Sequence, residues 1–176
     1  GENYINMFNN GDVQQFLNYI NNKNKKILVF VIDSLAHDSG YVDSKNSDDQ
    51  SLVYVNILNM FAKNGVLEET DAIYLVSNKF DAIKNSRYAS DNRNDNEIAL
   101  DFLQEEFKSL INNCKDSKNQ SKNKFKIKVL PYSIGSVKYE SIIDDFNMDY
   151  SLKIINEILA DSFVIKGGGW TKMFKL

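Results

Sequence analysis

Three short apolar runs interrupt the polar stretches of this chain and predict its strands. Ile27–Ile32 is an unbroken run of β-branched, aliphatic and aromatic residues, which is typical of a strand buried on both faces of a parallel sheet. Ile73–Val76 is a second run of the same kind. Apolar and polar residues alternate over Lys126–Leu130, which predicts a third strand that runs into Pro131.

Apolar residues recur at helical spacing around these strands. The clearest amphipathic segment is Glu97–Asn113, where Ile98, Phe102 and Leu103 share one face and Glu105 lies on the other. The same spacing predicts a short turn of helix and then a helix capped by Asp12 within Tyr4–Asn21, and two more helices over Ser51–Gly65 and Tyr150–Ala160.

Helices and strands therefore alternate along the chain. Alternation of this kind predicts parallel strands joined by right-handed crossovers, so the expected fold class is α/β, a three-layer α/β/α arrangement with a mainly parallel sheet. We expect one domain over residues 1–176, with residues 166–176 as a C-terminal tail. Three strands make a thin sheet for this many helices, which predicts missing neighbouring strands.

The segments between these elements are polar. Leu35–Asp49, Ala82–Asn96 and Lys115–Lys124 are predicted to be loops, and loops at strand ends often carry function. Val137–Phe146 fits either a β-hairpin or an irregular excursion. Phe163–Ile165 is a candidate for a last short strand before the glycine-rich tail.

Composition narrows the classes of function. The chain has 176 residues, 43% of them hydrophobic, and a formal net charge of -3, so it can bury a core and lacks the basic character of a nucleic-acid-binding protein. No apolar run approaches the roughly 20 residues that a membrane span needs. A single cysteine, Cys114, excludes an internal disulfide framework and fits a reducing, cytoplasmic setting.

The second strand ends in the chain's most informative polar cluster, Ser77-Asn78-Lys79-Phe80-Asp81. An amide, a cation and a carboxylate so close together are expensive to bury in an apolar core. In open α/β sheets, ligands bind just beyond the carboxyl ends of the strands. The position and chemistry of this cluster therefore predict a binding site.

With this motif in place, the chain resembles the back half of a Ras-like P-loop GTPase domain. In that family the fourth, fifth and sixth strands alternate with helices, the fifth ends in Asn-Lys-x-Asp, and the sixth leads into a Ser-Ala-x turn. Asn78, Lys79 and Asp81 match the first motif, and Ser133-Ile134-Gly135 takes the place of the second, with Ile134 where the family has alanine.

The resemblance implies a guanine site with one role for each matched residue. Guanine presents two adjacent donors, its ring N1–H and its exocyclic amine, which one carboxylate such as Asp81 can accept together. Asn78 would hydrogen-bond the base and brace the loop, and Lys79 would lay its stem over the ring. Ser133, Ile134 and Gly135 would offer backbone N–H groups to the guanine oxygen. A site built to make such hydrogen bonds rejects an analogue that cannot make them by roughly 10⁴–10⁵-fold.

The sequence also departs from that family. It contains no Gly-x-x-x-x-Gly-Lys-Ser/Thr loop to hold phosphates and no switch I threonine, and Gly1-Glu2 could be the tail of an Asp-x-x-Gly motif. We therefore expect a truncated domain of a divergent bacterial GTPase, not hydrolytic by itself. GTP or GDP with Mg²⁺ would be bound by the intact parent, and the upstream half would be a partner of this chain.

Other interpretations remain open from the residues alone. The chain could be an α/β protein-interaction module without a ligand, in which Lys79 and Asp81 pair with each other or cap a helix. Asp33-Ser34, with Asp38 and Ser39, could hold Mg²⁺, although an aspartate that caps a loop is the simpler reading. His37 is expected to be an ordinary exposed histidine, and Cys114 to be structural.

Overall fold

The structure is a computed structural model that describes residues 11–34, 46–89, 92–138 and 142–162. Its centre is a three-stranded sheet with the order β1-β2-β3 and both pairings parallel. The strands are β1 (Ile27–Asp33), β2 (Ala72–Asn78) and β3 (Lys126–Pro131). The three predicted strands and their parallel arrangement are confirmed, with β2 extended to the asparagine of the candidate motif.

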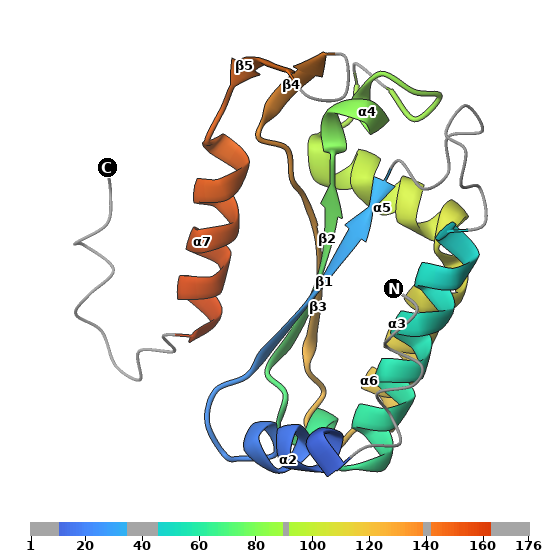
Figure 1. The fold of residues 1–176 in the computed structure, drawn as a ribbon, viewed down its shortest axis with the longest axis vertical. Coiled ribbons are helices and arrows are strands. Elements are labelled where there is room, and N and C mark those ends of the chain that lie inside the picture. The colour runs from blue at the N-terminus through green and yellow to red at the C-terminus, as the bar shows by residue number, and fades with distance from the viewer. Residues whose placement is uncertain (1–10, 35–45, 90–91, 139–141, 163–176) are drawn as a thin grey trace.

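Helices cover both faces of this sheet, so the fold is the three-layer α/β/α arrangement expected from the sequence (Figure 1). One face carries α3 (Asn46–Lys63), α5 (Asp95–Glu106) and α6 (Lys108–Gln120), and the opposite face carries α7 (Asp149–Ser162). Helix α2 (Gly11–Ile20) lies at the end of the sheet where the strands begin. The single turn η2 (Val66–Glu69) leads into β2.

The alternation of side chains along β2 divides the interior into two parts. Ile73 and Leu75 contribute to a large apolar core beneath α3, α5 and α6, whereas Tyr74 and Val76 face a smaller cluster that Ile154 of α7 joins. Six of the seven residues of β2 are buried, as expected for a central strand with helices on both sides.

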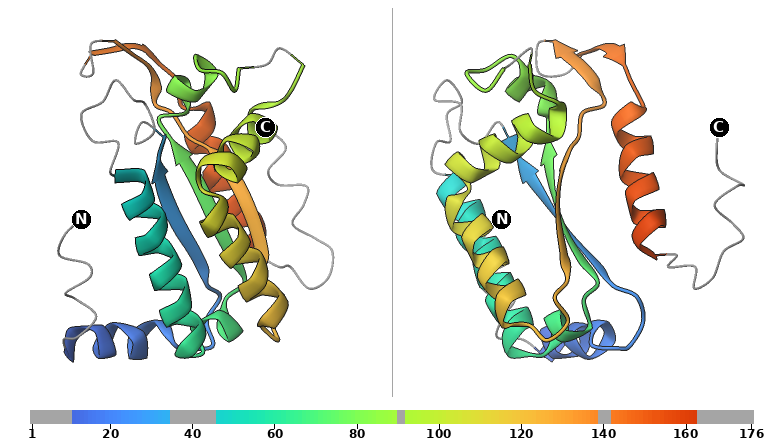
Figure 2. Two further views of the ribbon diagram at one scale, coloured as in Figure 1. Left: turned by 90° about the vertical axis from the view of Figure 1, so that its right-hand side faces the viewer. Right: turned by 180° about the vertical axis from the view of Figure 1, so that it is seen from behind.

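Within the described part of the chain, edge strand β1 is well covered on one face and only partly covered on the other, where Ile27 packs against the smaller cluster. Phe30 and Ile32 are buried in the large core, but Val29 and Val31 are 46% and 48% exposed. Val31 pairs in register with Val76 of β2, so it lies on the same face as α7. Helix α7 packs over β2 and β3, which leaves the β1 side of that face open (Figure 2).

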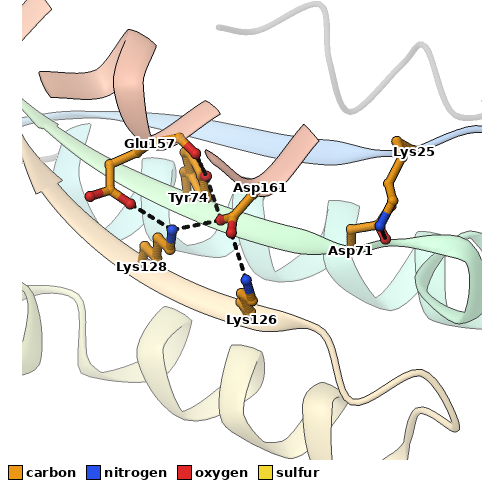
Figure 3. A network of polar contacts seen from close by, with 7 residues as sticks. All are labelled: Lys25, Asp71, Tyr74, Lys126, Lys128, Glu157 and Asp161. Carbon is orange, nitrogen blue, oxygen red and sulfur yellow. Dashed lines mark hydrogen bonds and ion pairs between the residues drawn. The ribbon is translucent and has the colours of Figure 1, made fainter. Parts of the chain in front are cut away.

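A polar network attaches α7 to the sheet (Figure 3). Asp161, whose side chain is 4% exposed, lies 2.6 Å from the ammonium groups of both Lys126 and Lys128. The Tyr74 hydroxyl donates to Asp161 at 2.6 Å, and Glu157 binds Lys128 at 2.6 Å. Burial alone would raise the pKa of Asp161, but the hydrogen bonds from the two lysines and Tyr74 hold that pKa well below its usual range.

Several loop predictions are wrong because helices extend into polar sequence. Residues 115–120, predicted to lie in a solvated loop, belong to α6, which is held by buried Leu110, Ile111 and Cys114. Likewise, α3 begins at Asn46, inside the predicted loop Leu35–Asp49.

The region of the candidate motif contains a helix that the sequence pattern does not predict. The predicted loop Ala82–Asn96 overlaps α4 (Phe80–Lys84), and α5 begins at Asp95 behind an Asn94–Glu97 capping box. The single helix predicted over Glu97–Asn113 is divided at Phe107, whose ψ of 36° departs from helical geometry.

Of the two alternatives for Val137–Phe146, the hairpin is the correct one. Strands β4 (Gly135–Lys138) and β5 (Ile142–Phe146) pair antiparallel above the end of β3 (Figure 1). The strand predicted over Phe163–Ile165, the tail after it and the start of the Tyr4–Asn21 helix lie outside the described residues. The described helix there begins at Gly11, one residue before the expected cap.

Candidate functional site

The end of β2 turns sharply into α4 at the residues of the Asn-Lys-x-Asp motif. Asn78 is the last residue of the strand, Lys79 has φ 55° and ψ 42°, and α4 begins at Phe80. In the described part of the chain, Lys79 is the single non-glycine residue with a positive φ. Such a conformation strains most residues, and strain of this kind is often found at functional sites.

Backbone hydrogen bonds join this turn to the end of β3. The backbone N–H of Lys79 donates to Asn78 Oδ1 at 2.9 Å, which braces the turn. The N–H of Phe80 donates to the Tyr132 oxygen at 2.9 Å, and the Tyr132 N–H donates to the Ser77 oxygen at 2.8 Å. The motif and the following turn of β3 are therefore held side by side.

Asp81 and Ser133 meet across this junction, although 52 residues separate them in sequence. The Ser133 hydroxyl is buried and lies 2.9 Å from Asp81 Oδ1 and 2.6 Å from the Gly135 oxygen, both of which can accept its proton. The Gly135 N–H donates back to the Ser133 hydroxyl at 3.2 Å. One oxygen of Asp81 is thus oriented from within the protein, and its side chain remains partly accessible to a ligand.

Gly135 is needed for the hairpin that follows this turn. Its φ is 130°, and a Cβ added here would lie 1.5 Å from the backbone oxygen of Asp145 on the facing strand. Ile134, 37% exposed, accepts a backbone hydrogen bond from Asn147 at 3.0 Å. All three residues of the predicted Ser-Ile-Gly turn therefore lie at the same edge of the sheet as the Asn-Lys-x-Asp motif.

The ammonium of Lys79 contacts a neighbouring strand. It lies 3.0 Å from Asp33 Oδ2, and both side chains are about half exposed, at 45% for Lys79 and 44% for Asp33. Asp33 ends β1 directly opposite Asn78 in the parallel register. The sequence predicts Asp33 as a metal ligand or loop cap, and no local pattern indicates Lys79 as its partner.

Helix α4 rests on a support formed by α5 and α7. Phe80 is fully buried, and its ring meets that of Tyr150 edge to face at 5.8 Å. The Tyr150 hydroxyl donates to Asp95 at 2.6 Å, and Lys84 of α4 pairs with the same carboxylate at 3.2 Å. Burial, followed by the hydrogen bond to Asp95, raises the pKa of Tyr150.

The described residues do not support the metal alternative. They contain no group of three or more histidine, cysteine or acidic side chains placed to hold an ion. The Ser34 hydroxyl is buried against that of Ser77 at 2.9 Å. His37, Asp38 and Ser39 lie outside the described residues.

Cys114 is structural, as expected. Its side chain is fully buried in α6, and burial raises the pKa of its thiol to about 12. A thiol with so high a pKa is not a nucleophile at neutral pH.

A hollow of about 450 Å³ lies on α5, away from the motif, and its charged groups are paired with one another. Arg87 binds Glu105 and Glu106 at 2.8 and 2.6 Å, and Arg93 pairs with Asp101. Ion pairs within its own lining explain this concentration of charge, so we assign no ligand to it.

No protein-family model, curated protein or solved structure matches the chain. Among the helices of the described ranges, none has both the length and the apolar composition that crossing a lipid bilayer requires.

Proposed function

We propose that this chain is the guanine-recognition half of a GTPase-like switch protein. The observation that carries the proposal is the contact between Asp81 and Ser133, with a distance of 2.9 Å between the hydroxyl and the carboxylate. It joins the two sequence segments expected to surround a purine base, at the carboxyl ends of neighbouring parallel strands.

The chemistry of the base fits the donors and acceptors at this edge. Ser133 orients one oxygen of Asp81, and the remaining acceptor capacity of the carboxylate suits the N1–H and amine of guanine. Adenine would place a ring acceptor against the same carboxylate, which is repulsive. Lys79 projects from the turn before α4 and offers a methylene stem to the face of the ring.

The phosphates and Mg²⁺ of GTP or GDP would be bound by the upstream half of the parent protein, because this sequence contains no phosphate-binding loop. This chain by itself would therefore bind the base weakly and would not hydrolyse GTP. In the intact parent, nucleotide hydrolysis would release loops ordered by the γ-phosphate.

The first test compares the binding of GMP and AMP to the chain by two-dimensional NMR. We expect GMP to shift the backbone amides of residues 78–84 and 133–135, with little change at the opposite end of the sheet. Equal shifts with AMP, or no shifts with either nucleotide, would remove the proposal.

An Asp81→Asn variant tests base selectivity. An amide in place of the Asp81 carboxylate cannot accept both guanine donors together, so the variant should lose at least about tenfold in GMP affinity. Because an amide can donate to the second carbonyl of xanthine, the variant should prefer XMP. Asp71→Asn is the matched control, because Asp71 pairs with Lys25 at 2.7 Å at the far end of the sheet (Figure 3). A variant that keeps full preference for GMP would contradict the assignment of Asp81.

The alternative is an α/β interaction module that binds no nucleotide. The uncovered side of β1, with Val29 and Val31 half exposed, favours a protein partner at that edge. The two functions are compatible if the partner is the upstream half of the parent. The module alone would be favoured if the protein bound a partner at β1 and showed no response to GMP.

A further inference from the structure

The ion pair between Lys79 and Asp33 links the ends of two strands beside the proposed base site. We propose that Asp33 is a positioning residue that fixes the ammonium of Lys79 and so presents the lysine stem to the purine ring. This inference rests on the proposed function, because it assigns a role to Asp33 in that same site.

The position of Asp33 is set by the backbone and by helix α3. Asp33 is the register partner of Asn78, so the carboxylate leaves β1 next to the residue that precedes Lys79. The Asp33 N–H donates to Gln50 Oε1 at 3.1 Å. Tyr54, one turn further along α3, donates to the Val31 oxygen at 2.5 Å. These contacts brace the end of β1, and the Asp33 carboxylate lies 3.0 Å from the Lys79 ammonium.

The backbone of Lys79 supports a use for its side chain. Glycine adopts a left-handed conformation without steric penalty, whereas Lys79, with φ 55°, adopts it at a steric cost. A lysine kept at such a position points to a function for its side chain. The Asp33 contact then restricts where that long and flexible side chain can lie.

The solvent exposure of the Lys79–Asp33 pair indicates a role in binding rather than in stabilising the fold. Because the side chains of Lys79 and Asp33 are 45% and 44% exposed, solvent screens their attraction, and the pair contributes little to folding. The ion pair would instead contribute to binding affinity, since a lysine that is already held loses less conformational freedom when a base packs on its stem. Loss of Asp33 should therefore weaken binding and leave stability nearly unchanged.

The test measures GMP binding by NMR titration for the unchanged chain, Asp33→Asn, Lys79→Met and the double variant, with Asp71→Asn as a control. Ordering one flexible side chain predicts an approximately two- to tenfold loss of GMP affinity for Asp33→Asn. In the Lys79→Met background the same substitution should have no further effect. Asp71→Asn, which breaks the Lys25 pair at the other end of the sheet, should bind GMP like the unchanged chain.

A second readout follows the Lys79 ammonium itself. Its side-chain NMR signals should show restricted motion in the unchanged chain and free motion in Asp33→Asn, with little change in melting temperature. The role of Asp33 would be overturned, without affecting the proposed function, by either of two results. One is GMP binding by Asp33→Asn that equals that of the unchanged chain. The other is an equal loss of GMP affinity from this substitution with and without Lys79. Absence of GMP binding by the unchanged chain would overturn the proposed function and this inference with it.

Discussion

Lys79 and Gly135 both hold backbone conformations that most residues avoid, and both lie beside the candidate site. Their roles differ. Lys79 starts α4 and extends its side chain toward Asp33, whereas Gly135 lets β4 approach the backbone of Asp145 closely. The sequence identified both positions as parts of a motif, but the structure shows that Gly135 is required by the packing of the hairpin.

Replacing Gly135 with alanine should destabilise the protein by more than about 2 kcal/mol, because the left-handed backbone and the clash with the Asp145 oxygen act together. Gly65→Ala is the matched control. Gly65 has φ 74° but nothing within 4 Å of an added Cβ, so its replacement should cost about 1 kcal/mol. Urea unfolding measures both, and equal losses would contradict the proposed role of hairpin packing.

Among the elements, α7 depends on polar contacts for its position. Ile154 and Ile158 face the sheet, but Leu152, Ile155 and Leu159 remain about half exposed. The buried carboxylate of Asp161, bound by Lys126, Lys128 and Tyr74, is therefore one of the contacts that hold α7 on the sheet. Burial, then the hydrogen bond to Asp161, raises the pKa of Tyr74 to about 12, so its hydroxyl remains a donor at physiological pH.

The stability of this attachment should depend on pH through Asp161. Its pKa is lowered in the folded protein, so its contribution is complete above the unfolded value of roughly 4 and is lost as the pH falls toward the folded value. Asp161→Asn should cost about 2–3 kcal/mol at neutral pH. Below about pH 4 the difference from the unchanged chain should shrink.

Unfolding curves collected from pH 7 to pH 2 measure this difference. Glu105→Gln serves as a control, because Glu105 forms an exposed pair with Arg87 and should change stability by at most about 1 kcal/mol. A loss for Asp161→Asn that stays constant down to pH 2 would show that the charge of Asp161 is not what holds α7.

At the scale of the whole molecule, the sheet is covered evenly on one face and unevenly on the other. The large core lies beneath α3, α5 and α6, while the β1 side of the α7 face is open at Val29 and Val31. Under the proposed function, the upstream half of the parent would cover this area.

Substitution of Val31 by threonine tests this view, because threonine keeps the β-branched shape and adds a hydroxyl. In this chain, where Val31 is 48% exposed, the change should alter stability by less than about 0.5 kcal/mol. In the intact parent it should cost about 1–3 kcal/mol, because the hydroxyl would be buried. Val76→Thr, on the same sheet face but 4% exposed, should cost that amount in both proteins.

Melting and urea unfolding of the two proteins provide the comparison. A small effect of Val31→Thr in the intact parent would mean that the upstream half does not cover β1. An effect in this chain as large as that of Val76→Thr would contradict the open face itself.

The sequence by itself determined the strands, their parallel arrangement and the position of the motif. Ile27–Ile32 and Ile73–Val76 are continuous β-branched and aromatic runs, and their alternation with amphipathic helices permits few arrangements other than a parallel sheet. It did not determine the helix ends. The buried residues of α6 stop at Cys114, and the polar turns after them look like a solvated loop in sequence.

Only the tertiary structure decided which polar groups meet. Ser133 reaches Asp81 across 52 residues and Lys79 reaches Asp33 across 46, because strand register and sheet order bring their elements together. Asp161 likewise becomes a buried anchor only because α7 crosses the two lysines of β3. Local pattern fixes which face of an element is apolar, but the partner of a polar side chain depends on packing between elements distant in sequence.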